Sequence, residues 1–136
     1  MRARHCLAFI LSLGAGASAA SGVQADRYFA VRAFHGGNPT EFVVRVTEAT
    51  RAQAFDRALA EGRPVRLAAR VVRQPAAWNP AWPFHTERHR LVSTDTLVAR
   101  CPSHAPGTVA KLVSAGAQLQ GSAWCPVVTI VREVRR

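Results

Sequence analysis

Side chains able to do chemistry gather in one stretch, Trp78–His85, which holds two of the three Trp and ends in a His. Arg73 precedes this stretch, and Arg88 and Arg90 follow it. Aromatic and Arg side chains dominate the hot spots of binding surfaces, so an exposed stretch could hold an acidic or sugar-like ligand. The residues we expect to make these contacts are Trp78, Asn79, Trp82, His85 and Arg88.

The same stretch has two other interpretations. A small sheet needs a cover, and Trp78, Trp82 and Phe84 could fold back over its open end, because each ring buries a large apolar area. Three prolines within nine residues would lower the conformational entropy lost in holding such a loop in place. In the third interpretation, His85 is a catalytic residue.

Enzyme templates are absent from the sequence. It contains no nucleophile elbow, no H-E-x-x-H and no glycine-rich phosphate loop. Its eight acidic residues are sparse, which leaves little material for a paired-carboxylate acid/base site. A hydrolase would have to pair His85 with a carboxylate such as Glu87 or Asp95. We therefore predict that the protein is not an enzyme.

His85 and His89 are four residues apart and could bind a metal together with Asp95 and His104. The pair lacks the Glu of the metalloprotease motif, and Pro83 just upstream does not favour a helix that would place both rings on one face. Solvated loop histidines are far commoner than such a site. We therefore predict no metal and no cofactor.

Residues 1–25 have the features of a secretory signal peptide. These are, in order, the basic Arg2 and Arg4, the short apolar run Leu7–Leu13 and the small-residue cleavage signal Val23-Gln24-Ala25, with an earlier cut after Ala17-Ser18-Ala19 as the alternative. The apolar run is shorter than the roughly 20 residues that a membrane-spanning helix needs. The expectation is a secreted or periplasmic protein with a single domain over residues 26–136 and no transmembrane segment.

The chain is strongly basic, with a formal net charge of +10. Such a field favours acidic partners, so we expect a protein, a glycan or an anionic surface as partner. The Arg residues are scattered and form no run, so specific nucleic-acid binding is not expected. No feature of the sequence calls for an oligomer, and we expect a monomer.

Two cysteines, Cys101 and Cys125, remain after the signal peptide is removed. An exported chain meets an oxidising compartment, and two Cys allow a single intramolecular pairing. A disulfide between them closes a loop of about 25 residues, worth roughly 3 kcal/mol in the chain-entropy model. We expect it to join the end of one strand to the start of the last.

Apolar periodicity and turn residues predict strands and helices in alternation. The expected strands are Tyr28–Phe34, Phe42–Val46, Val65–Arg73, Leu91–Ser93 with Thr96–Cys101 as one interrupted strand or two, and Val127–Val134. In the second strand, Phe42, Val44 and Val46 should share one face, with Val43 and Arg45 on the other. The sum is an α+β fold: a largely antiparallel sheet of about five strands with one or two packed helices.

The best-supported helix follows the second strand. Ala52, Phe55, Ala58 and Leu59 recur at helical spacing and form one apolar stripe. Thr47 or Thr50 is the expected N-cap, since Thr50 and Gln53 have the capping-box spacing, and Gly62 is the expected C-terminal stop. A second helix is expected from Pro106 to near Gly116.

The order of segments resembles a known family. It runs through Tyr28-Phe29-Ala30-Val31-Arg32, Phe42–Thr47, Gly62-Arg63-Pro64, Trp78–His85 with its Asn-Pro-x-Trp-x-x-His block, and Trp124-Cys125-Pro126. The resemblance is to small secreted domains named after the N-terminal domain of a calmodulin-binding protein, and it covers residues 27–134. It implies the family's fold, but the family name does not imply calmodulin binding by an exported chain.

Two acidic positions of the family pattern differ here. Thr86-Glu87-Arg88 stands where an Asp-Pro follows the His, and Arg100-Cys101 replaces an acidic residue beside the first Cys. If relatives hold a cation there, this chain is expected to have lost it. The function we expect is an exported, non-enzymatic binding or interaction domain that uses the Trp78–His89 surface. The alternatives are an inhibitor of a secreted protease or hydrolase, and a small hydrolase using His85.

Overall fold

The computed structural model describes residues 25–35 and 38–136. The predicted signal peptide, residues 1–25, lies outside the described residues except for its last position. The elements are β1 (Arg27–His35), β2 (Asn38–Val46), α1 (Ala49–Glu61), β3 (Val65–Val72), β4 (His85–Val92), α2 (Pro106–Ser114), the short 3₁₀ turn η1 (Gln120–Ser122), β5 (Ala123–Trp124) and β6 (Val127–Val134).

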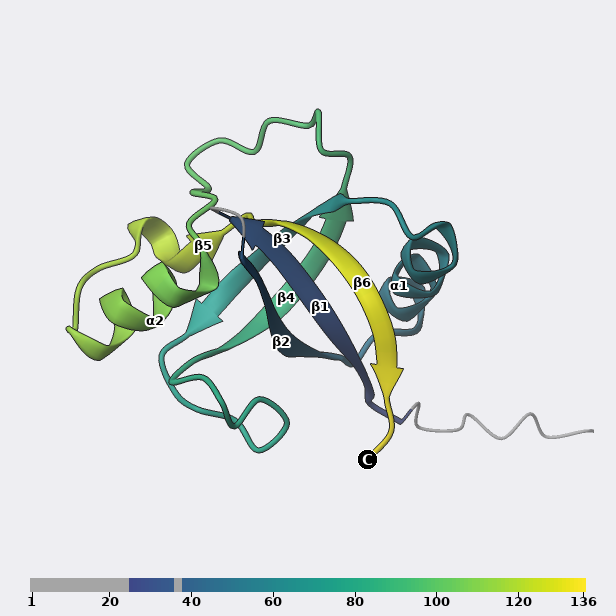
Figure 1. Ribbon diagram of the computed structural model, residues 1–136, viewed down its shortest axis with the longest axis horizontal. Coiled ribbons are helices and arrows are strands. Elements are labelled where there is room, and N and C mark those ends of the chain that lie inside the picture. The colour runs from purple at the N-terminus through teal and green to yellow at the C-terminus, as the bar shows by residue number, and fades with distance from the viewer. Residues whose placement is uncertain (1–24, 36–37) are drawn as a thin grey trace, which may run out of the picture.

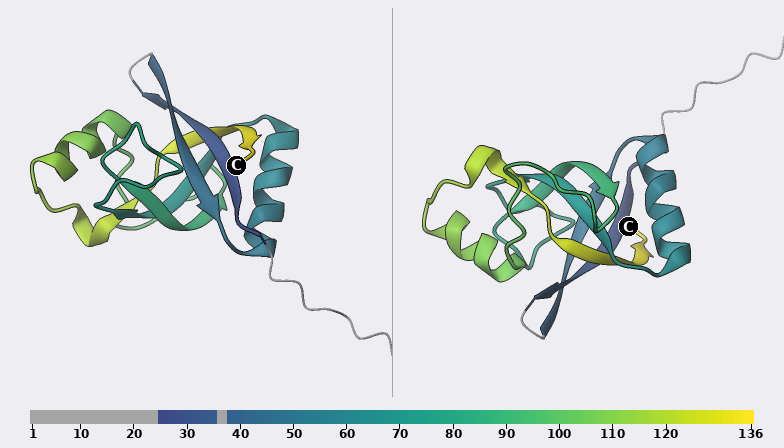
Figure 2. Two further views of the ribbon diagram at one scale, coloured as in Figure 1. Left: turned by 90° about the horizontal axis from the view of Figure 1, so that it is seen from below. Right: turned by 90° about the horizontal axis from the view of Figure 1, so that it is seen from above.

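The strands form one antiparallel sheet in the order β2-β1-β6-β3-β4, with β5 paired to β3. This confirms the predicted α+β fold, with six strands in the sheet. The sheet is strongly curved, and α1 and α2 lie at opposite sides of it (Figures 1 and 2). Its two end strands, β2 and β4, come close to each other without pairing. We call the gap between them the seam.

The β1–β2 hairpin has one buried face and one half-exposed face. Phe42, Val44 and Val46 are buried, whereas Val43 and Arg45 are partly exposed, as predicted. The alternation follows from the two-residue period of a strand with one face on the core.

Helix α1 buries Ala52, Phe55 and Ala58 of the predicted stripe against the sheet, and Leu59, its fourth member, is partly buried. Gly62 ends the helix in the left-handed conformation (φ 64°) and donates its N–H to the Ala58 carbonyl at 3.0 Å, also as predicted. The predicted Thr caps are wrong. Glu48 is the N-cap residue, without a side-chain cap bond, and Thr50 already lies inside the helix.

The prediction for the middle of the chain needs a larger correction. β4 begins at His85, six residues before the expected start, and residues 96–101 form no strand. The sequence His85–Arg90 is mostly polar, so no apolar alternation marks it as a strand. Pairing with β3 organises it instead.

The Cys101–Cys125 disulfide is confirmed, with Cα atoms 5.4 Å apart. Cys101 lies in the long loop after β4 and not at a strand end, so the bridge fastens this loop to the segment between β5 and β6. The disulfide is consistent with an oxidising, extracellular environment. In the described part of the chain, no helix is long and apolar enough to cross a membrane.

Candidate functional site

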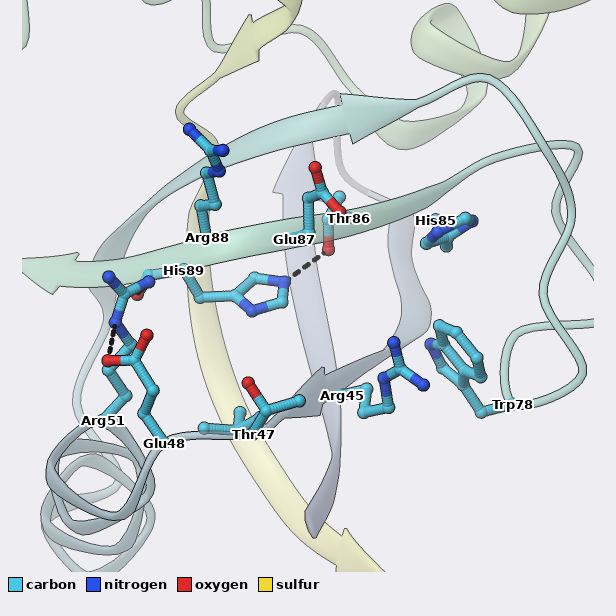
Figure 3. Close-up of a pocket in the computed structure, with 11 residues that line it drawn as sticks. Arg45, Thr47, Glu48, Arg51, Trp78, His85, Thr86, Glu87, Arg88 and His89 are labelled. Carbon is cyan, nitrogen blue, oxygen red and sulfur yellow. Dashed lines mark hydrogen bonds and ion pairs between the residues drawn. The ribbon is translucent and has the colours of Figure 1, made fainter. Parts of the chain in front are cut away.

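A β-bulge in β4 decides which way its polar side chains point. Ala68 pairs with Arg90 and Arg70 pairs with Glu87, so two residues of β4, Arg88 and His89, lie opposite the single Ala69. Arg88 has a left-handed backbone conformation (φ 55°), which is typical of the first residue of a G1 bulge. Beyond it, His89 faces inward, whereas the side chains of Glu87 and Arg88 extend to the opposite side of β4 (Figure 3).

The inward side of β4 borders a cavity of about 260 Å³, which we call the seam pocket (Figure 3). It lies in the seam, between the end of β2, the start of α1 and the first half of β4. The lining residues are Arg45, Val46, Thr47, Glu48, Arg51, Trp78 and residues 85–89. The seam thus brings together three segments that are far apart in the sequence.

Trp78 forms one wall of the seam pocket. The Arg45 guanidinium carbon lies 4.2 Å from the centre of the indole ring, a cation–π contact, and His85 meets the ring edge-on at 5.2 Å. The indole edge that carries Nε1 faces Arg45 and the pocket (Figure 3). This Nε1 atom is buried and has no hydrogen-bond partner among the described residues.

Asn79 and Trp82 do not line the seam pocket, and both hold the loop in place. Asn79 is only 2% exposed. Its Oδ1 accepts from the Val43 N–H at 2.9 Å, and its Nδ2 donates to the Phe84 carbonyl at 3.0 Å. The amide therefore bridges the seam between β2 and the start of β4.

Trp82 adds a second link to the edge of β2, because its Nε1 donates to the Glu41 carbonyl at 3.0 Å. Its ring lies 5.7 Å from that of Phe84, which is fully buried. These contacts give the loop the covering role of the second interpretation. Of the Trp and Phe residues in this stretch, Trp78 is the one that borders the seam pocket.

His85 is half-buried, and its Nδ1 lies 2.7 Å from the Gln74 carbonyl. A carbonyl can only accept, so Nδ1 carries the proton and Nε2 of the neutral ring is left as an acceptor. Glu87 instead lies 3.5 Å from Arg70. In the described residues, no carboxylate hydrogen-bonds to His85, and no cluster of three His, Cys, Asp or Glu could hold a metal.

His89 is 3% exposed, and its Nε2 lies 2.7 Å from the Thr86 hydroxyl. Burial, and to a smaller extent the positive charge of Arg51, lower the pKa of His89 to about 4. Arg51 also donates to the His89 carbonyl at 3.0 Å and pairs with Glu48 at 3.0 Å. At neutral pH, His89 is therefore an uncharged polar part of the pocket wall.

Of the three arginines expected at the site, Arg88 borders the seam pocket, whereas Arg73 and Arg90 do not. Arg73 donates to the Ala117 carbonyl, and Arg90 is an exposed residue of β4 that does not line the pocket. Arg45 and Arg51 take their place. The one available signal for Arg45 was its charge within an otherwise apolar strand. Nothing local marked Arg51, because it lies on the polar side of a helical pattern.

The profile of the family described as the BP-74 N-terminal domain matches residues 25–136. The chain belongs to this family. The match spans the described structure and confirms the resemblance drawn from the motifs. In this BP-74 N-terminal domain, the Asn-Pro-x-Trp-x-x-His block supplies the seam-bridging Asn79, the edge-capping Trp82 and the pocket residue His85. Comparisons with curated proteins and with solved structures gave no match.

Proposed function

We propose that this BP-74 N-terminal domain is an exported, non-enzymatic binding domain whose seam pocket takes a small ligand with anionic oxygens. The observation that carries the proposal is the buried Nε1–H of Trp78, which lacks an acceptor among the described residues at the wall of a cavity. Leaving a buried donor unpaired costs about 1–3 kcal/mol. A ligand oxygen that displaces the groups covering this atom would supply the missing acceptor and remove this cost.

The charge beside Trp78 supports an acidic ligand. The Arg45 guanidinium stacks on the indole, and its nearest carboxylate, Asp26, is 3.7 Å away at the surface. A guanidinium held over an aromatic ring is already oriented and can take a carboxylate or phosphate through two parallel hydrogen bonds. The two acidic residues of the lining both have a cationic partner, since Glu48 pairs with Arg51 and Glu87 lies 3.5 Å from Arg70.

The remaining polar groups narrow the ligand class. His85 Nε2 can accept from a hydroxyl group, because its Nδ1 is committed to the Gln74 carbonyl. A cavity of about 260 Å³ lies below the range usual for drug-sized ligands, which favours a small molecule. A sugar acid or a sugar phosphate combines these properties: small size, hydroxyl groups and anionic oxygens.

Isothermal titration calorimetry of the disulfide-bonded protein tests this function with glucuronate, glucose 6-phosphate and neutral glucose. We expect binding of at least one of the acids and none of glucose. Trp78→Phe keeps an aromatic ring but removes the N–H, so the Kd should rise about tenfold. The matched control is Trp82→Phe, which loses an indole N–H away from the pocket and should leave the Kd unchanged.

Two results would contradict the proposal. One is the absence of heat with either acid at millimolar concentration. The other is an equal loss of affinity in the Trp78 and Trp82 variants. Recovery of the ligand chemically changed after incubation would contradict the non-enzymatic part alone.

The inhibitor alternative rests on the tip of the same loop. Pro80 and Ala81 are exposed between the anchored Asn79 and Trp82, and Trp82 N–H closes the turn onto the Asn79 carbonyl at 3.2 Å. A braced, exposed turn could enter a protease cleft. Incubation with secreted proteases tests this function: inhibition supports it, and rapid cleavage within the loop rejects it.

A further inference from the structure

The side of β4 away from the seam pocket carries a second hollow surface, which we call the outer groove. It consists of two adjoining hollows of about 330 and 490 Å³, which share Ala99, Gly121 and Ala123. Its lining residues come from β3, from β4 and from the loop that follows β4, elements that can be located in Figure 1. The apolar residues that line it are small, namely Ala68, Ala69, Val98, Ala99 and Ala123.

Four arginines line the outer groove: Arg70, Arg88, Arg90 and Arg100. Among the described residues that line it, none is acidic and none is aromatic. Arg70 lies 3.5 Å from Glu87, and both side chains are about half exposed, so this pair is weak. In the described part of the chain, no carboxylate pairs with the other three.

Strained backbone conformations are also found at the outer groove. Arg88, Arg100 and Ser122 are the described non-glycine residues with positive φ, at 55°, 55° and 56°. Two of them are groove arginines, and the third follows the lining residue Gly121. The left-handed conformation costs a non-glycine residue about 1–2 kcal/mol, and Gly is the usual residue in a bulge of this type. The fold thus holds Arg side chains over the groove where Gly would be less strained, and strain of this kind clusters at functional sites.

We propose that the outer groove binds a linear anionic polysaccharide through its sulfate or carboxylate groups. Guanidinium groups match both anions with paired hydrogen bonds. Single-stranded nucleic acid fits less well, because none of the described lining residues is an aromatic ring on which bases could stack. An acidic protein fits less well too, because large side chains anchor protein interfaces, whereas the apolar residues among the described lining of the groove are small.

The proposed polysaccharide site and the seam pocket share Arg88 among their lining residues, whereas Arg70, Arg90 and Arg100 line the outer groove alone. The left-handed arginines also allow a test in which folding is not at risk. Replacement by Gly removes both the charge and the strain, so Arg88→Gly and Arg100→Gly should fold at least as well as the parent.

The experiment measures binding of a fluorescent heparin octasaccharide by anisotropy at low and moderate salt. We expect binding that weakens with salt. The Arg88→Gly/Arg100→Gly variant should bind at least about tenfold more weakly, with a Tm no lower than that of the parent. The matched control, Arg63→Gln/Arg135→Gln, removes two exposed arginines outside the groove and should change the Kd less than about threefold.

Equal weakening in the two double variants would overturn the site and leave only a general charge effect. Unchanged affinity in the Gly variant would overturn it as well. Tighter binding of a glutamate octapeptide or an eight-residue deoxythymidine strand than of the octasaccharide would overturn the ligand class. The proposal is supported if the Gly double variant binds the octasaccharide more weakly while the Gln control does not. The octasaccharide must also bind more tightly than the other two probes.

Discussion

The Thr86 hydroxyl and Nε2 of His89 lie 2.7 Å apart inside the domain, although residues three apart in an unbroken strand face opposite sides. The bulge at Arg88 removes this conflict by adding one residue to β4 opposite Ala69. The same feature directs the Arg88 side chain to the outer groove. One irregular residue therefore shapes both surfaces for which we propose ligands.

Acid should destabilise the protein in a window set by His89. The pKa of His89 is about 4 in the fold and 6.5 in an ordinary environment, so the unfolded chain takes up the proton first as pH falls. The contribution of the buried, neutral His89 ring to the unfolding free energy is complete above pH 6.5. It is lost as the pH falls to about 4. The unfolding free energy should fall by about 3 kcal/mol across this window.

Urea unfolding at pH 7, 6, 5 and 4 measures this dependence. His89→Gln removes the titration and should flatten the curve between pH 6.5 and 4. Hydrogen bonds from Arg27 are the main cause that lowers the pKa of Asp56 and of Glu133. Their contribution to stability is lost only as the pH falls below their ordinary pKa values, so this loss should remain in His89→Gln. An unchanged slope in His89→Gln would show that other groups carry the acid sensitivity.

Asn79→Ala should destabilise the fold strongly. It would leave the Val43 N–H and the Phe84 carbonyl without their partner at a buried position, at a cost of about 2–4 kcal/mol. Thermal and urea unfolding measure the loss. Asn38→Ala, at an exposed position of β2, is the control and should change the unfolding free energy by less than about 0.5 kcal/mol.

Trp82→Ala tests whether this residue is part of the cover. It removes a hydrogen bond to the Glu41 carbonyl and the packing against Phe84, so we expect a loss of about 2–4 kcal/mol in unfolding free energy. Trp82→Phe, which keeps most of the packing, should lose about 1 kcal/mol. If Trp82→Ala left the Tm unchanged, the loop would not have the stabilising role assigned to it.

Reduction of the disulfide should loosen the loop after β4. Cys101 and Cys125 are 24 positions apart, and opening a loop of this length is worth about 3 kcal/mol in the chain-entropy model. The Tm of the parent should fall on addition of a reductant, whereas that of Cys101→Ala/Cys125→Ala should be low already and insensitive. A reductant effect of equal size in the double variant would contradict this assignment.

The part of the fold with a local signature could be read from the sequence. The buried stripe of α1, its Gly62 stop, the two faces of β2 and the span of β6 follow from periodicity and turn chemistry within a few residues. The disulfide also followed, since two cysteines in an oxidised chain allow one bridge. For the helix stripe, the Gly62 stop and the two strands, the signal lies within a single segment, whereas the disulfide follows from the cysteine count.

Tertiary structure decided the rest. β4 is polar, so its strand character and its bulge come from pairing with β3 and cannot be seen in its own residues. The contact of Arg45 with Trp78 depends on the curvature that brings β2 and β4 together. The sequence alone thus determined most of the elements and their apolar faces. Contacts between distant segments, for which periodicity carries no signal, decided the seam, the arginine-lined groove and the indole N–H that lacks a partner among the described residues.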